Sequence, residues 1–137
     1  MREYVMTSKF MAGYIKCGFD ENGRLVKFEN AALLTDVQLQ HIYNPVYFPL
    51  TESKFTALAG NKCTIEEVSE LTFDRFWKEY DCKKGKIQTE KEWRKLTEEE
   101  KAKAIGRIKA FKFDCKSHNR ELVYPERYLK HRRYDDE

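Results

Sequence analysis

The lysines and arginines of this chain are the side chains best placed to do chemistry, and most of them lie in its second half. Residues 71–134 hold nineteen Lys and Arg against eleven Asp and Glu, a formal charge of +8. Residues 1–70 hold seven against nine, a charge of −2. A charge asymmetry of this kind indicates an anionic partner for the basic half. A solvated helical surface would show the same excess of cations.

Eight basic residues are candidates for contact with phosphate groups. They come from the lysine-rich segment CKKGKIQ, from a predicted helix whose apolar face lies elsewhere, and from the C-terminal stretch YPERYLKHRRYDDE. The candidates are Lys83, Lys84, Lys86, Arg107, Lys112, Lys130, Arg132 and Arg133. Such contacts release counterions from nucleic acid, so we expect salt-sensitive binding that depends weakly on base sequence.

The C-terminal stretch combines two expected roles. Tyr128 and Leu129 should pack inward and hold the last helix against a cluster of Phe76, Trp77 and Trp93. The basic residues after them should stay exposed, available to phosphate or to the acids Asp135, Asp136 and Glu137 that close the chain.

Neither catalytic nor metal-binding patterns are present in the sequence. The three histidines lie in different segments, and the chain has no G-x-S-x-G, H-E-x-x-H or phosphate-binding Gly-rich loop. Its four cysteines form no C-x-x-C pair, which favours reduced thiols, and Cys115 with His118 supplies only half of a metal-ligand set. We therefore predict a protein that is not an enzyme and that uses no cofactor and no metal.

The first half of the chain has the pattern of a small sheet with two short helices. The β-branched and aromatic run from Glu3 to Phe19, the turn DENG and the run RLVKFENA predict one long β-hairpin. Thr35 and Gln38 form a capping box for a short helix, Thr51 begins a second one, and KCTIEEVS predicts a third strand. We expect a ββααβ unit over residues 1–70.

Helical patterns fill the second half, residues 71–137. Four aromatic residues from Phe73 to Tyr80 share one helical face, and capping boxes at Thr89 and Thr97 predict two further helix starts. The helix from Thr97 should be the longest, running through Cys115, and Pro125 should begin the last one. The fold class is therefore α+β, with a bundle of about four helices after the sheet-containing unit.

The second half also resembles a C-terminal module of phage and prophage proteins, some of them linked to replication initiation. The matching elements are Phe76, Trp77 and Tyr80; Lys83 to Lys86; Trp93, Leu96, Thr97, Glu100 and Lys101; and Pro125, Tyr128, Leu129, Arg132, Arg133, Tyr134, Asp136 and Glu137. The module commonly has Trp where this chain has Tyr134, and often Asn where it has Lys130. The resemblance implies a mobile-element origin and proximity to nucleic acid.

Three functions are compatible with these features. The first is a phage-encoded binder of RNA, DNA or a host nucleoprotein. The second is an inhibitor of a host defence system, of the anti-CRISPR type, that binds the effector or its guide RNA. The third is a protein-docking subunit. No apolar run approaches the ~18 residues that cross a membrane, so we expect no membrane partner and a location in the cytoplasm of the bacterial host.

Overall fold

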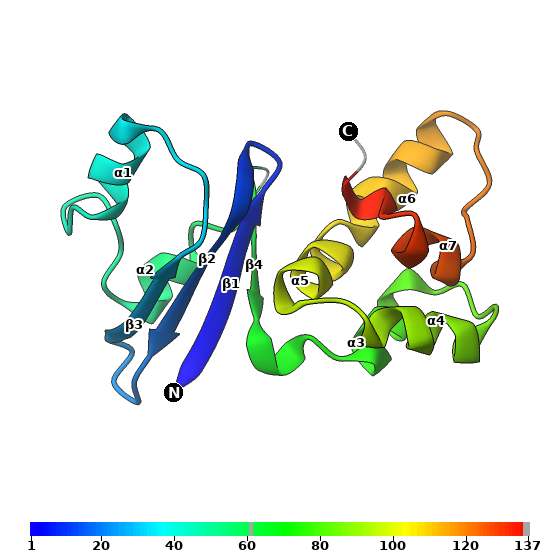
Figure 1. The fold of residues 1–137 in the computed structure, drawn as a ribbon, viewed down its shortest axis with the longest axis horizontal. Coiled ribbons are helices and arrows are strands. Elements are labelled where there is room, and N and C mark those ends of the chain that lie inside the picture. The colour runs from blue at the N-terminus through cyan, green and yellow to red at the C-terminus, as the bar shows by residue number, and fades with distance from the viewer. Residues whose placement is uncertain (61, 136–137) are drawn as a thin grey trace. The chain divides into compact units, whose positions relative to one another are not determined.

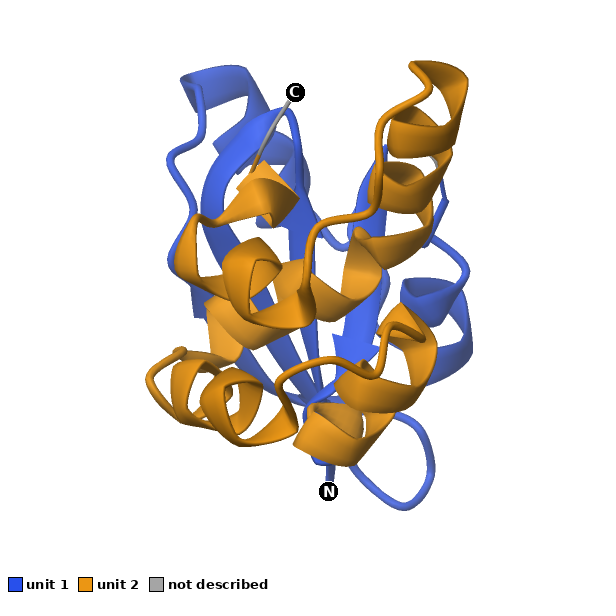
Figure 2. Cartoon of the chain, turned by 90° about the vertical axis from the view of Figure 1, so that its right-hand side faces the viewer, with its two compact units in different colours: residues 1–69 blue, residues 70–137 orange. Residues whose placement is uncertain are grey.

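The computed structural model describes residues 1–60 and 62–135. It divides into two compact units, Met1–Ser69 and Glu70–Glu137 (Figures 1 and 2). Unit 1 contains an antiparallel sheet and two short helices, whereas the described part of unit 2 is helical. The predicted α+β fold class is confirmed.

Unit 1 has one more strand than the sequence predicts. Its elements are β1 (Arg2–Ser8), β2 (Met11–Phe19), β3 (Leu25–Asn30), α1 (Asp36–Ile42), α2 (Glu52–Thr56) and β4 (Cys63–Glu67). The sheet order is β3-β2-β1-β4, with every pair antiparallel. The single long strand predicted from Glu3 to Phe19 is wrong, because the chain reverses at Lys9 and Phe10. That turn contains no Gly, Pro, Asn or Asp; its one turn-forming residue is Ser8, a weaker signal, whose hydroxyl accepts from the Phe10 N–H at 3.1 Å.

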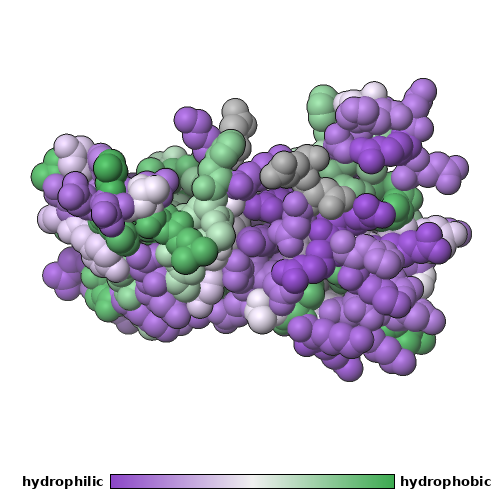
Figure 3. Space-filling view, turned by 45° about the horizontal axis from the view of Figure 1, so that its top comes forward, coloured by the Kyte–Doolittle hydropathy of each residue, from purple (hydrophilic) through white to green (hydrophobic). Residues whose placement is uncertain are grey.

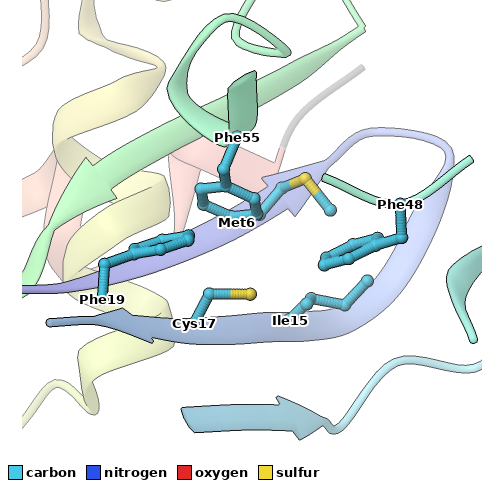
Figure 4. Close-up of a cluster of buried hydrophobic side chains, with 6 residues drawn as sticks. All are labelled: Met6, Ile15, Cys17, Phe19, Phe48 and Phe55. Atoms are coloured by element: carbon cyan, nitrogen blue, oxygen red, sulfur yellow. The ribbon is translucent and has the colours of Figure 1, made fainter. Parts of the chain in front are cut away.

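The core of unit 1 lies between the sheet and the segments that follow β3. Side chains of β1 and β2 meet the rings of Phe48 and Phe55 there (Figure 4). The cluster is Met6, Ile15, Cys17, Phe19, Phe48 and Phe55. Burial raises the pKa of the Cys17 thiol to about 12, so this cysteine stays protonated. The capping box predicted at Thr35 and Gln38 is confirmed.

A carboxylate at the start of α2 joins that helix to β1. Glu52 accepts two hydrogen bonds from the Arg2 guanidinium, both at 2.5 Å, and one from the Tyr4 hydroxyl at 2.6 Å. These hydrogen bonds lower the pKa of Glu52 to about 2, and those from Arg2 have the largest effect. Burial and the same carboxylate raise the pKa of Tyr4 to about 12.

We expect Glu52→Gln to destabilise unit 1 at neutral pH by an amount that shrinks in acid. A carboxyl whose pKa is lowered by folding contributes stability that is complete above its unfolded pKa and is lost as the pH falls towards its folded pKa. For Glu52 this window runs from the ordinary value of 4.5 down to about 2. Urea unfolding of the parent and the variant at several pH values measures the difference. The matched control is the exposed Glu21→Gln, and an equal pH-dependent loss there would contradict the assignment.

Unit 2 has five α-helices in its described part, against the four predicted. They are α3 (Phe73–Tyr80), α4 (Lys86–Arg94), α5 (Glu98–Gly106), α6 (Ile108–Ser117) and α7 (Pro125–Lys130), preceded by the short helix η1 (Val68–Glu70) and followed by η2 (Arg133–Asp135). The start at Pro125 and the capping box at Thr97 and Glu100 are confirmed.

Two predicted helix features of unit 2 are wrong. Thr89 is no N-cap, because α4 begins three residues earlier and the Thr89 hydroxyl, inside the helix, donates to the Gly85 carbonyl at 2.7 Å. The predicted long helix is interrupted at Arg107, where α5 ends and α6 begins. Gly106 lies just before the break, and glycine is unfavourable in the interior of a helix.

Tyr128 is the centre of the aromatic core of unit 2. Its fully buried ring lies 6.0 Å from Phe76, 5.0 Å from Tyr80 and 5.0 Å from Phe111. The Tyr128 hydroxyl donates to the Ala104 carbonyl at 2.7 Å, which satisfies a polar group that burial would otherwise penalise. Leu129 is also buried, so the expected inward packing of α7 is confirmed.

The two tryptophans expected to share this core have different environments. Trp93 is buried, and its ring stacks on Phe76 at 5.3 Å. Trp77 is only half-buried and stacks on Phe73 at 5.8 Å, at the border of the cluster. The prediction therefore holds for Trp93 and overstates the burial of Trp77.

Tyr128→Ala should lower the free energy of unfolding by about 3–5 kcal/mol, because it empties the middle of a packed aromatic cluster. Tyr128→Phe should lower it by about 1 kcal/mol, since only the hydrogen bond to Ala104 is lost. Denaturant unfolding monitored by tryptophan fluorescence measures both. Tyr124→Ala, at a side chain that is 56% exposed, is the control. A Tyr128→Ala protein as stable as this control would contradict the central position of Tyr128.

Candidate functional site

The lysine-rich segment between α3 and α4 contains three of the predicted binding residues. The side chains of Lys83, Lys84 and Lys86 are all exposed. Asp81 and Gly85, with φ of 54° and 68°, turn the backbone before and after Lys83 and Lys84. Within residues 1–60 and 62–135, no carboxylate lies within salt-bridge distance of the three ammonium groups. Lys86 is the first residue of α4, so the group surrounds a helix N-terminus.

The charge distribution at this helix N-terminus is unusual. Cations are unfavourable near the positive end of a helix dipole, where acids and capping side chains are normally found. The first turn of α4 contains no acid, and Gly85 at the N-cap position supplies no side-chain acceptor. The lysine charges and the first backbone N–H groups therefore add to one local positive potential.

Lys130 is a fourth exposed cation and has no salt-bridge partner in the described part of the chain. It is the last residue of α7, and α7 packs against α4. The helix that follows the lysine-rich segment and the helix that carries Lys130 are therefore neighbours within unit 2. The lysine-rich segment and Lys130 therefore adjoin two helices that are in contact.

Two of the predicted binding residues, Arg107 and Lys112, instead contact other parts of unit 2. Arg107, whose side chain is only 11% exposed, donates to the Tyr134 carbonyl at 2.8 Å and forms an ion pair with Asp135 at 3.5 Å. Lys112 donates to the Glu79 carbonyl at 3.0 Å, near the end of α3, and lies over the Tyr80 ring. A cation at a helix C-terminus stabilises the unpaired carbonyl groups there. Both cations thus have internal partners.

The arginines after α7 lie at a sharp turn of the backbone. Arg132, with φ of 51°, forms ion pairs with Glu100 at 3.2 Å and with Asp135 at 3.4 Å. The expected pairing with Asp135 is therefore present for Arg132, whereas Asp136 and Glu137 lie outside the described residues. Arg133 is exposed at the start of η2.

The sequence-based candidates for phosphate contact leave out several exposed cations of unit 2. Residues of this kind without a salt bridge in the described chain are Lys78, Lys91, Lys109, Lys116 and Arg127. A helical spacing rule would have found four of them, all but Lys78, because no acid lies three or four residues away within the same helix. Arg94 and Lys103, which do have an acid four residues earlier, form ion pairs with it.

The acids of unit 2 are largely occupied by other cations. Ion pairs join Glu79 with Arg75, Glu90 with Arg94, Glu92 with Lys95, Glu99 with Lys103, and Asp114 with Arg120. The positive excess of the sequence is therefore concentrated on the unpaired lysines. Among the described residues there is no group of three or more His, Cys, Asp or Glu side chains arranged to hold a metal ion. None of the described helices is both long enough and apolar enough to span a bilayer.

Comparison with known families identifies a relative of unit 2. Residues 68–132, slightly less than half of the chain, match the model of the Legionella vir region protein LvrA C-terminal domain. The matched region runs from η1 through α7 and contains the lysine-rich segment, Arg107, Lys112 and Lys130. No curated protein and no solved structure matches this chain. Unit 2 thus contains most of a C-terminal module that also occurs in another protein, and unit 1 lies outside the match except for Val68 and Ser69.

Arg107→Met should destabilise unit 2 by about 1–3 kcal/mol, because it removes a hydrogen bond from a charged donor and an ion pair at a nearly buried position. Amide exchange in η2 should accelerate more than exchange in α3, since Tyr134 and Asp135 lose their anchor. Lys109→Met removes the same charge from an exposed position nearby and should leave both quantities unchanged. Identical behaviour of the two variants would show that Arg107 has no anchoring role.

Proposed function

We propose that this chain is a small non-enzymatic protein that binds nucleic acid, alone or within a nucleoprotein, through the basic surface of unit 2. The nucleic acid is RNA or DNA of a bacterial host or of a phage or prophage that encodes the protein. A nucleoprotein such as the effector complex of a host defence system presents the same phosphate groups through its guide RNA. The site of action is the host cytoplasm.

The observation that supports this proposal is the positive N-terminus of α4. Lys83, Lys84 and Lys86 are exposed and unpaired at the end of a helix where cations lower stability by roughly 0.3–1 kcal/mol each. An anion bound there would gain from the ammonium groups and from the free backbone N–H groups at once. Phosphate groups have the charge and the acceptor oxygens for this environment.

The contact pattern favours binding without base readout. Lysine is a flexible point charge, and phosphate contacts carry no sequence information by themselves. The aromatic rings of unit 2 that could stack on bases are used in its core, where Phe76, Tyr80 and Tyr128 are fully buried. The proposed binding is therefore electrostatic and weakly selective for sequence.

The triple variant Lys83→Ala, Lys84→Ala, Lys86→Ala should weaken binding to every nucleic acid tested. Fluorescence anisotropy with labelled single-stranded RNA, single-stranded DNA and duplex DNA over a salt series measures the affinity and its salt slope. The slope should fall by about two to three units, near one per lost phosphate contact. Circular dichroism should show an intact fold, because all three side chains are exposed.

A second triple variant separates this site from general charge effects. Lys9→Ala, Lys54→Ala and Lys62→Ala remove the same charge from exposed positions of unit 1 and should change the slope by much less. Equal losses in the two triple variants would reject the site around α4. A parent chain that binds none of the three probes at low salt, and captures a host complex only after its nucleic acid has been digested, would reject nucleic acid as the ligand.

A further inference from the structure

One segment of unit 1 differs sharply in composition from the rest of the chain. Residues 31–50 contain a single Asp, Glu, Lys or Arg, which is Asp36, although 36% of the whole chain is charged. The segment includes α1 and the chain that leads to α2. An uncharged stretch of this length is unexpected on the surface of so polar a protein, unless something covers it.

The segment exposes six large apolar or aromatic side chains. They are Leu33, Val37, Tyr43, Val46, Tyr47 and Leu50, which we call the apolar face, and they are between 51% and 83% exposed. The space-filling view shows hydrophobic surface around α1 and the segment after it, whereas the helices of unit 2 present mostly hydrophilic surface (Figure 3). The apolar face is therefore a local feature of unit 1.

Contacts around Tyr43, Val46 and Tyr47 order the middle of the apolar face. The Tyr43 ring packs on Phe28 at 5.6 Å, and the Tyr47 ring lies 4.6 Å from His41. The Asn44 side-chain oxygen accepts a hydrogen bond from the Val46 N–H at 2.9 Å. The Asn44 backbone carbonyl accepts one from the Tyr47 N–H at 3.0 Å. Phe48, in the same segment, is buried in the core. A face ordered in advance loses little conformational entropy when a partner binds.

We propose that the apolar face is the interface of a homodimer, in which a second copy of this chain docks on it around a twofold axis. Six side chains of these sizes and exposures offer on the order of 700 Å² of apolar surface, more than a typical monomer leaves in one patch and near the ~800 Å² that each partner buries in a standard interface. The area is thus sufficient for a stable dimer.

The charge of the face favours a second copy over an anionic partner. A twofold axis places a surface against itself, so any net charge on it would meet its own sign. The single carboxylate of residues 31–50 makes this repulsion small, and the same segment offers no Lys or Arg for nucleic acid. The Tyr43 and Tyr47 hydroxyls can exchange hydrogen bonds with polar groups of the other copy, as aromatic residues at interfaces commonly do.

Sedimentation equilibrium of the full chain tests the proposal. We expect a dimer with a dissociation constant at or below about 10 μM. Val46→Glu, at a side chain that is 83% exposed, should raise this constant at least about 100-fold, because twofold symmetry brings two buried carboxylates into one interface. Circular dichroism should show that the variant remains folded.

Phe113→Glu is the matched control, since it introduces the same charge at an apolar side chain of unit 2 that is 73% exposed. It should leave the dimer intact. A parent chain that stays monomeric at about 200 μM, twenty times the expected constant, would overturn the proposal. So would a trimer or larger assembly, or a Val46→Glu protein that dimerises like the parent. A monomeric parent that captures a different protein through Val46 would assign the face to that protein and likewise overturn the homodimer.

Discussion

The packing of the Tyr128 ring against α3, α5 and α6 is the contact on which the rest of unit 2 depends. The ring lies near the end of the described chain, yet it stacks on Phe76 in the first long helix of the unit and its hydroxyl bonds to a carbonyl of α5. Tyr80 adds a bond in the reverse direction, from its hydroxyl to the Val123 carbonyl at 2.6 Å. Burial raises the pKa of both phenols, so they remain neutral donors at any physiological pH. The basic helices are short, and this shared core is what holds them in place.

Much of the local structure could be predicted because its causes are local. The capping boxes at Thr35 and Thr97 depend on residues three positions apart. Pro125 suits the first position of a helix, where the N–H that proline lacks would have no partner within the helix. The errors arose where local signals were silent or ambiguous. The reversal at Lys9 and Phe10 is marked only by Ser8, a weak turn signal. Thr89 fits a capping box, although Gly85, with positive φ, begins the helix earlier.

The candidate site was partly predictable for the same reason. The exposure of Lys83, Lys84 and Lys86 follows from a polar, glycine-containing segment between two helices. The internal roles of Arg107 and Lys112 could not be foreseen, because each donates to a distant backbone carbonyl, of Tyr134 and Glu79 respectively, which no pattern of charged residues reveals. A cation that caps a carbonyl far along the chain looks the same in a sequence as one that faces solvent.

The strand order of unit 1 bears on how the chain folds during synthesis. β1 lies inside the sheet, between β2 and β4. Its edge that faces β4 is paired only after the chain has been synthesised through β4, in which Cys63 is the partner of Ser8. Until that segment leaves the ribosome, β1 presents an open edge that can pair with the wrong strand. All the residues of unit 1 precede those of unit 2, however, so the sheet can close while the basic helices are still being translated. This order of emergence gives the sheet time to complete its pairing before the aromatic side chains of unit 2 are available to compete for its core.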